Sequence, residues 1–135
     1  MRKHACGLML VFGIALAGCS TSPTPVIAPG PWGGSHVSMS VTSAGARLEY
    51  DCAEGVIEEA LRPDAAGRFT ANGIHTPGHG GPIRVDEVLP SFRARYEGRV
   101  DGERMDLLVT LTETGVALGS FQLRRGNSGI LLRCL

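Results

Sequence analysis

Histidines and nearby carboxylates are the residue types in this chain that could hold a metal ion. His75 and His79 lie four residues apart in the stretch GIHTPGHGGP, and Asp86 and Glu87 follow it. Imidazole and carboxylate groups are ligands for zinc and copper. However, residues at i and i+4 share a face only on a helix, and so much glycine and proline predicts an exposed turn with solvated histidines. Metal binding, with His36 as a third candidate ligand, is the alternative.

The N-terminal residues point to a second chemistry, lipidation. Arg2 and Lys3 precede the apolar run LMLVFGIA, and the segment ends in LAGC at residues 16–19. The apolar run has about ten residues, whereas a membrane-spanning helix needs about 20. A basic start, a short apolar run and two small residues before a cysteine resemble the lipobox of bacterial lipoproteins. The resemblance implies cleavage before Cys19, a diacylglyceryl thioether on its sulfur and a fatty acyl chain, such as palmitate, on its new amine.

This resemblance also sets the expected location. Several acyl chains attach a protein stably to a bilayer, so we expect a lipid-anchored protein of the cell envelope. Ser20 follows the cysteine, instead of the Asp that usually retains such proteins in the inner membrane, so in a Gram-negative cell we expect the outer membrane, facing the periplasm. Without residues 1–18 the chain has 11 Arg, no Lys and 13 Asp plus Glu, a formal charge of −2. Such a balanced charge predicts no nucleic-acid partner.

The cysteines that remain after export form one pair. Cys6 leaves with the signal peptide and Cys19 is acylated, so Cys52 and Cys134 are left in an oxidising compartment. We predict a structural disulfide between them, which stabilises the fold by about 4 kcal/mol in the loop-entropy model. A redox or metal-binding thiol pair is the alternative, but no CxxC spacing supports it.

Strands must position these residues, because the hydrophobic period outside the N-terminal segment is two. Four prolines among small polar residues at 20–31 predict a semi-extended tether, so we expect the folded domain to begin near Trp32. Trp32 itself is expected to plug one end of the core. Clear alternation predicts one hairpin at 37–41 and 46–52, and a second at 92–101 and 104–112 around the turn Asp101-Gly102. Weaker patterns predict strands at 56–61, 68–75, 117–124 and 129–134.

The pattern as a whole predicts an all-β fold. Short turns favour an antiparallel meander of about eight strands, closed as a small lipocalin-like up-and-down barrel, with a β-sandwich as the alternative. We divide the chain into a signal peptide (1–18), an acylated cysteine with its tether (19–31) and a single all-β domain (32–135). A phase change around Gly119 predicts a bulge. Inward positions include both small and large residues, such as Gly98 and Phe92, so a ligand cavity and a filled core both remain open.

Two further patterns bear on binding and catalysis. Arg93, Arg95 and Arg99 form a row on the predicted outer face, which could bind an acidic glycan or lipid head group. Carboxylates on and across from this row make cross-strand pairing the commoner outcome. The chain contains no GxSxG, HExxH, SxxK or GxxxxGK[ST] motif. We therefore expect no enzyme and no cofactor.

A second resemblance covers nearly all of the exported chain. It is to a group of small uncharacterised bacterial envelope proteins, and it implies a single domain without assigning any site residue. The residues that carry it are Trp32-Gly33-Gly34, His36, Gly45-Ala46, Leu48-Glu49-Tyr50-Asp51-Cys52-Ala53, Gly55, Asp64, Gly67-Arg68-Phe69, Gly80-Gly81-Pro82 and Cys134-Leu135.

Together these patterns predict a membrane-anchored, non-enzymatic binding or interaction module. Its partner would be a small apolar ligand or another envelope protein, the latter through an exposed apolar patch near Leu108 and Leu131. The alternative is a metal-dependent enzyme or metal-binding protein that uses His75 and His79.

Overall fold

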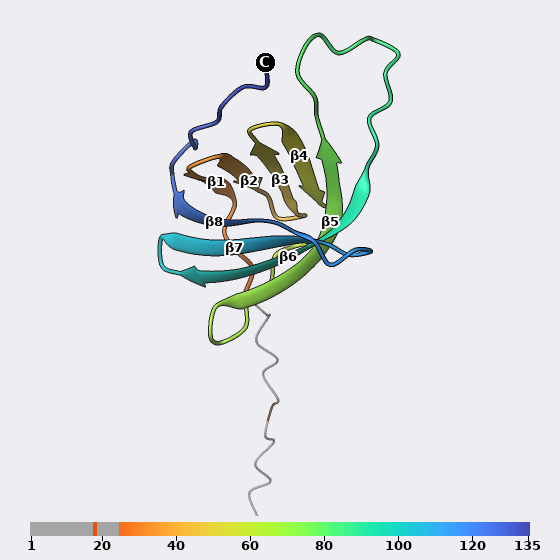
Figure 1. Cartoon of the computed structure of the whole chain (residues 1–135). Coiled ribbons are helices and arrows are strands. Elements are labelled where there is room, and N and C mark those ends of the chain that lie inside the picture. Colours follow the sequence, from red (N-terminus) through yellow and green to blue (C-terminus); the bar gives the residue numbers. More distant parts are fainter. Residues whose placement is uncertain (1–17, 19–24) are drawn as a thin grey trace, which may run out of the picture.

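Eight antiparallel strands form a closed barrel in the computed structural model (Figure 1). The structure describes Gly18 and residues 25–135, so the expected signal peptide, acylated Cys19 and most of the tether lie outside the described residues. Each strand pairs with the next along the chain, and β8 pairs with β1. The prediction of an all-β meander barrel is confirmed, and the sandwich alternative is wrong. The strands are β1 (Gly30–Gly34), β2 (Val37–Val41), β3 (Ala46–Tyr50), β4 (Ala53–Ile57), β5 (Arg68–Pro77), β6 (Phe92–Asp101), β7 (Arg104–Leu111) and β8 (Ala117–Arg125).

Alternation of side chains produces the barrel wall. In β2, Val37, Met39 and Val41 are buried, and the residues between them face outward. The register of the β7–β8 pair shifts between Val109 and Thr110, opposite Gly119, which confirms the predicted bulge. Among the described residues, no helix is long and apolar enough to cross a membrane.

Side chains fill the interior of the barrel. Seventeen buried hydrophobic residues form one cluster, in which Trp32 is only 1% exposed. Aromatic rings cover two inward glycines of the long strands, Gly98 and Gly119. A Cβ on Gly98 would collide with the ring of Phe69, and a Cβ on Gly119 would lie 2.6 Å from Cζ of Phe121. The small inward residues therefore make room for rings, and the geometry supports a filled core.

The turns divide the barrel into two ends. The connections after β2, β4 and β6 form the N-terminal end, where the Ile27 N–H donates to the Leu61 carbonyl at 3.0 Å. The connections after β1, β3, β5 and β7 form the opposite end, which residues 129–135 cross. We call this segment the strap and this end the strap end. In Figure 1 the C-terminus and the long β5–β6 loop lie on one side of the barrel and the chain enters from the other.

Three predicted elements differ from the structure. The strand predicted at 56–61 is β4 at Ala53–Ile57, because a tight turn at residues 51–52 starts it earlier. The segment 129–134 is not a strand, since a single bridge between Ser35 and Ile130 is its only strand-like pairing. The glycine-rich stretch from residue 73 is not all turn, because β5 continues to Pro77. Glycine at position 73 allows that continuation, because a Cβ there would collide with the Val56 carbonyl.

Candidate functional site

The strap is held against the β1–β2 turn by backbone hydrogen bonds. The His36 N–H donates to the Ile130 carbonyl at 2.8 Å, and the Ile130 N–H donates to the Gly34 carbonyl at 2.9 Å. Glycine is required where the chain crosses β1, because a Cβ on Gly33 would collide with the backbone nitrogen of Gly129. His36 adopts a φ of 67°, the left-handed region that non-glycine residues seldom occupy. The turn and the strap therefore fit each other closely.

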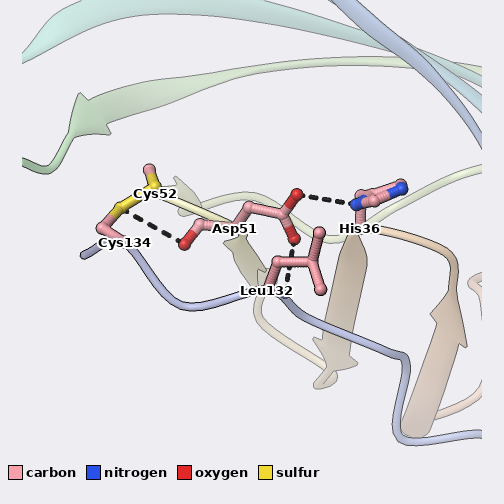
Figure 2. A network of polar contacts seen from close by, with 5 residues as sticks. All are labelled: His36, Asp51, Cys52, Leu132 and Cys134. Atoms are coloured by element: carbon pink, nitrogen blue, oxygen red, sulfur yellow. Dashed lines mark hydrogen bonds and ion pairs between the residues drawn. A yellow bond between two sulfur atoms is a disulfide. The ribbon is translucent and has the colours of Figure 1, made fainter. Parts of the chain in front are cut away.

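Asp51 fixes the next part of the strap (Figure 2). The Leu132 N–H donates to its Oδ1 at 2.8 Å, and Nδ1 of His36 lies 2.6 Å from its Oδ2. The Leu132 hydrogen bond, and then the one from His36, lower the pKa of the Asp51 carboxyl. The predicted disulfide between Cys52 and Cys134 is present, with Cα atoms 5.5 Å apart. Consecutive residues of one turn thus bind the strap by a carboxylate and by a covalent bridge.

The β5–β6 loop, residues 78–91, lies beside the end of the strap. The Gly78 N–H donates to the Cys52 carbonyl at 2.7 Å. Position 80 must be glycine for the strap to reach the loop, since a Cβ there would collide with the carbonyl of Leu135. One surface is therefore built from the β1–β2 and β3–β4 turns, the strap and the loop.

An ion pair braces this loop. Nε2 of His79 lies 2.5 Å from Oε1 of Glu87, and Nδ1 lies 2.8 Å from the Gly80 carbonyl oxygen. The Arg84 N–H donates to the other oxygen of Glu87 at 3.2 Å. Because both ring nitrogens face acceptors, the carbonyl of Gly80 and then Glu87 raise the pKa of His79 above its ordinary value of 6.5. His79 and the Arg84 N–H lower the pKa of Glu87.

These shifts predict a loop whose order depends on pH. The contribution of protonated His79 to the stability of the loop is complete below the pKa of His79 in the unfolded chain. It is lost as the pH rises through the raised pKa of the folded state. The contribution of Glu87 is present above its unfolded pKa and is lost as the pH falls through its lowered folded pKa. An NMR titration should therefore place the pKa of His79 above 6.5, and Glu87→Gln should lower it. As the pH rises through the pKa of His79, amide exchange in the loop should accelerate by more than the intrinsic pH dependence of exchange. A His79 pKa at or below 6.5 would contradict the pairing.

The candidate metal ligands do not converge. His75 is buried in β5 with its ring 5.7 Å from the ring of Tyr50, so the prediction that it is solvated in an exposed turn is wrong. Burial lowers its pKa, and Nδ1 has no hydrogen-bond partner among the described residues. His79 is paired with Glu87 and His36 with Asp51. Within residues 25–135, no group of three His, Cys, Asp or Glu side chains could hold a metal ion.

Two tyrosines extend the buried polar group around His75. The Tyr96 hydroxyl donates to the Ile74 carbonyl at 3.0 Å, and burial raises the pKa of Tyr96 to about 12. Burial also raises the pKa of Tyr50. Both hydroxyls lie over Gly55, where a Cβ would be 2.6 Å from the hydroxyl of Tyr96 and 3.3 Å from that of Tyr50. Both tyrosines thus face inward, as predicted, and both phenols stay neutral at physiological pH.

The three arginines of the predicted row, Arg93, Arg95 and Arg99, differ in their ion-pair partners. Nη2 of Arg93 lies 3.7 Å from Oε1 of Glu113, and Nη2 of Arg95 lies 3.1 Å from Oε1 of Glu97. The third arginine, Arg99, forms no ion pair with any residue that the structure describes. Arg93 therefore pairs across to a residue that follows β7, as expected, whereas Arg95 pairs with a carboxylate of its own strand and not across the sheet.

The strap end also exposes large hydrophobic side chains, a feature that the sequence pattern did not reveal. Val85 and Val88, in the β5–β6 loop, are fully or almost fully exposed. The predicted apolar positions contribute less, since Leu108 is 38% exposed on the outer face of β7 and Leu131 is half-buried. The sequence indicates this surface only indirectly, through apolar residues that lie in the β5–β6 loop and outside any strand. The exposed residues at this end are Ile83, Val85, Val88, Phe92, Val116, Leu118, Ile130, Leu132 and Leu135.

Charged groups at the strap end are largely paired with one another, so its exposed apolar groups are the ones left for a partner. The pairs are His36 with Asp51, His79 with Glu87, Arg84 with Asp86 and Arg93 with Glu113. This arrangement suits contact with another surface better than acid–base chemistry. Comparisons of the chain with protein-family models, with curated proteins and with solved structures find no match.

Proposed function

We propose that this chain is a bacterial envelope lipoprotein, anchored through acylated Cys19, whose barrel is a non-enzymatic module that docks another envelope protein. The observation that carries the proposal is the set of nine exposed hydrophobic residues at the strap end. Large exposed apolar groups that gather on one part of a protein mark interaction sites. The partner surface is correspondingly apolar and lacks a strong net charge, because most ionic groups of this end, with the exception of Arg133, are paired internally.

The position of the N-terminal segment supports this orientation. Residues 25–29 reach the barrel at the N-terminal end, where Ile27 bonds to Leu61. A lipid on Cys19 would hold that end toward the bilayer and present the strap end to the aqueous compartment. The apolar residues would then face other envelope proteins, rather than the membrane that holds the anchor.

The packing of the barrel favours a protein partner over a small apolar ligand. Lipocalin-like barrels hold a ligand only when their interior has free space. Here rings occupy the places that Gly98 and Gly119 leave open. A metal-dependent activity gains no support from the histidines either, because His75 is buried beside Tyr50 and His79 is engaged by Glu87.

Site-specific photo-crosslinking in living cells tests the docking surface. A photoreactive amino acid at Val85 or Val88 is expected to give one discrete adduct with a protein of a different mass. Leu108 provides the matched control, because it is an exposed apolar residue on the outer wall of β7, away from the strap end. The same substitution at Leu108 should give no such adduct.

The partner identified in this way should then bind the purified chain. Val85→Asp together with Val88→Asp is expected to weaken that binding at least about tenfold, because each variant places a charge in an apolar contact. The melting temperature should not change, since both side chains are exposed. An adduct at twice the mass of the chain would indicate self-association, and that result or equal labelling from Leu108 would contradict the proposal.

A further inference from the structure

A groove of about 810 Å³ lies on the outer face of β6, β7 and β8, beside the β1–β2 turn. It exists because β1 and β8 pair at only two positions, Trp32 with Arg125 and Gly33 with Arg124. Gly34, the last residue of β1, and Ser35, which follows it, place little side-chain volume against the groove. The groove is large enough for a small organic ligand.

Arginines on three adjacent strands line this groove. Arg104 of β7 stands directly opposite Arg124 of β8, and Arg99 of β6 lies diagonally across from Arg104. Residues directly opposite in an antiparallel pair have Cβ atoms about 5 Å apart, and diagonal neighbours about 7–8 Å apart. The three side chains are thus within reach of one another, and like charges placed in this way destabilise a sheet.

No carboxylate of the described residues lies within ion-pair distance of these three arginines, although Asp101 and Asp106 stand directly opposite Arg104 and Arg99. Arg99, Arg104 and Arg124 form no ion pair with any residue that the structure describes. Arg93 and Arg95, on the same face of β6 but outside the groove, both have carboxylate partners. Arginines outside the groove, such as Arg125 and Arg133, also lack an ion pair among the described residues. In the groove, however, Arg104 and Arg124 stand directly opposite each other, which suggests that an anion from outside the chain compensates this pair.

The remaining lining residues define the rest of the ligand. Asp101 and Asp106 stand opposite Arg104 and Arg99 in the register, and they accept hydrogen bonds rather than donate them. They suit the hydroxyl groups of a polyol. The neutral polar residues of the groove, which suit hydroxyl or phosphate oxygens, are Ser35, Ser120, Gln122 and Asn127.

We propose that this groove binds a phosphorylated polyol, with its phosphate between Arg104 and Arg124 and its hydroxyl groups toward Asp101 and Asp106. Guanidinium groups match the geometry of phosphate oxygens and form strong charge-assisted hydrogen bonds with them. Two sources supply this chemistry, a soluble sugar or glycerol phosphate and the head group of a phospholipid such as phosphatidylglycerol. A second like-charge pair exists, because Glu49 of β3 stands directly opposite Glu54 of β4. This pair lines neither this groove nor the second cavity, which lies beside residues 40–47.

Thermal unfolding of the full chain in non-ionic detergent micelles tests the proposal. Glycerol phosphate is compared with sodium chloride of equal ionic strength, and phosphatidylglycerol with phosphatidylcholine in mixed micelles. A ligand that binds only the folded state raises the melting temperature. Arg104→Gln is expected to weaken the effective ligand at least about tenfold, because it removes charge-assisted hydrogen bonds. Without ligand, Arg104→Gln should change the melting temperature little, because it removes both the repulsion from Arg124 and the attraction to Asp101.

Arg93→Gln is the matched control, because Arg93 lies on the same face of β6 outside the groove. It should keep the full response to the ligand. Arg124→Gln provides a second variant and should behave like Arg104→Gln. A response to glycerol phosphate supports a soluble ligand, and a response to phosphatidylglycerol alone supports a lipid head group. No response to either compound, or an equal loss of response in Arg93→Gln, would overturn the proposal.

Discussion

Replacing Cys52 and Cys134 together by serine should lower the free energy of unfolding by about 4 kcal/mol. The bridge joins residues 82 positions apart, so it removes much of the conformational freedom of the unfolded chain. Serine has a similar size, and Cys52 is exposed and Cys134 half-buried, so little packing is lost with the sulfur atoms. Urea denaturation measures the change, and the midpoint should fall while the far-ultraviolet spectrum stays that of a β-protein.

The effect should concentrate at the strap end. The strap keeps its hydrogen bonds to Asp51 and to the β1–β2 turn without the bridge, but these bonds are exposed to water. Amide exchange should therefore rise first in residues 129–135 and in the β5–β6 loop, and least in β5 and β6. Chemical reduction of the wild-type chain should reproduce the double substitution. A loss below about 1 kcal/mol, or exchange that rises equally throughout the barrel, would contradict this role of the bridge.

Phe69→Ala is expected to destabilise the barrel by about 3–5 kcal/mol. Phe69 is 4% exposed, and its ring covers the backbone of Gly98. Truncation therefore leaves a void in the middle of the core, which the closed sheet cannot easily collapse around. Phe92→Ala is the matched control, because Phe92 is 42% exposed at the strap end. Its truncation should lower the free energy of unfolding far less.

A double-mutant cycle shows whether the ring and the glycine depend on each other. Gly98→Ala alone should destabilise the barrel, since its methyl group would collide with the ring of Phe69. In the Phe69→Ala background the same methyl group would occupy part of the void, so the cost of Gly98→Ala should fall or change sign. Additive effects of the two substitutions would contradict the filled interior, and with it the preference for a partner that binds outside the barrel.

Local patterns were sufficient to predict most of the wall. Alternation in residues 37–52 and 92–112 predicted two hairpins, and the Asp101-Gly102 turn is where β6 meets β7. These features depend on neighbouring residues, so the sequence displays them directly. The disulfide was predictable for another reason, because export and lipidation would leave only Cys52 and Cys134.

The strap end was much less predictable, because it is built by contacts between distant residues. Asp51 and Leu132 are 81 residues apart, and nothing near either one indicates that a carboxylate will accept the backbone N–H. His75 was misplaced for a related reason. Glycine at position 73 suggested a turn, whereas the close approach of the Val56 carbonyl requires glycine in a strand. The arginine pair of the groove likewise becomes visible only when the register sets Arg104 opposite Arg124.

Native mass spectrometry of the full chain, released gently from membranes in detergent, tests the central claim most directly. The account predicts a polypeptide that begins at Cys19, carries acyl chains and lacks two hydrogens for the bridge between Cys52 and Cys134. It also predicts a complex with a second protein, which Val85→Asp with Val88→Asp removes. A chain without lipid, or one that has no protein partner and retains an apolar small molecule in both forms, would contradict the account.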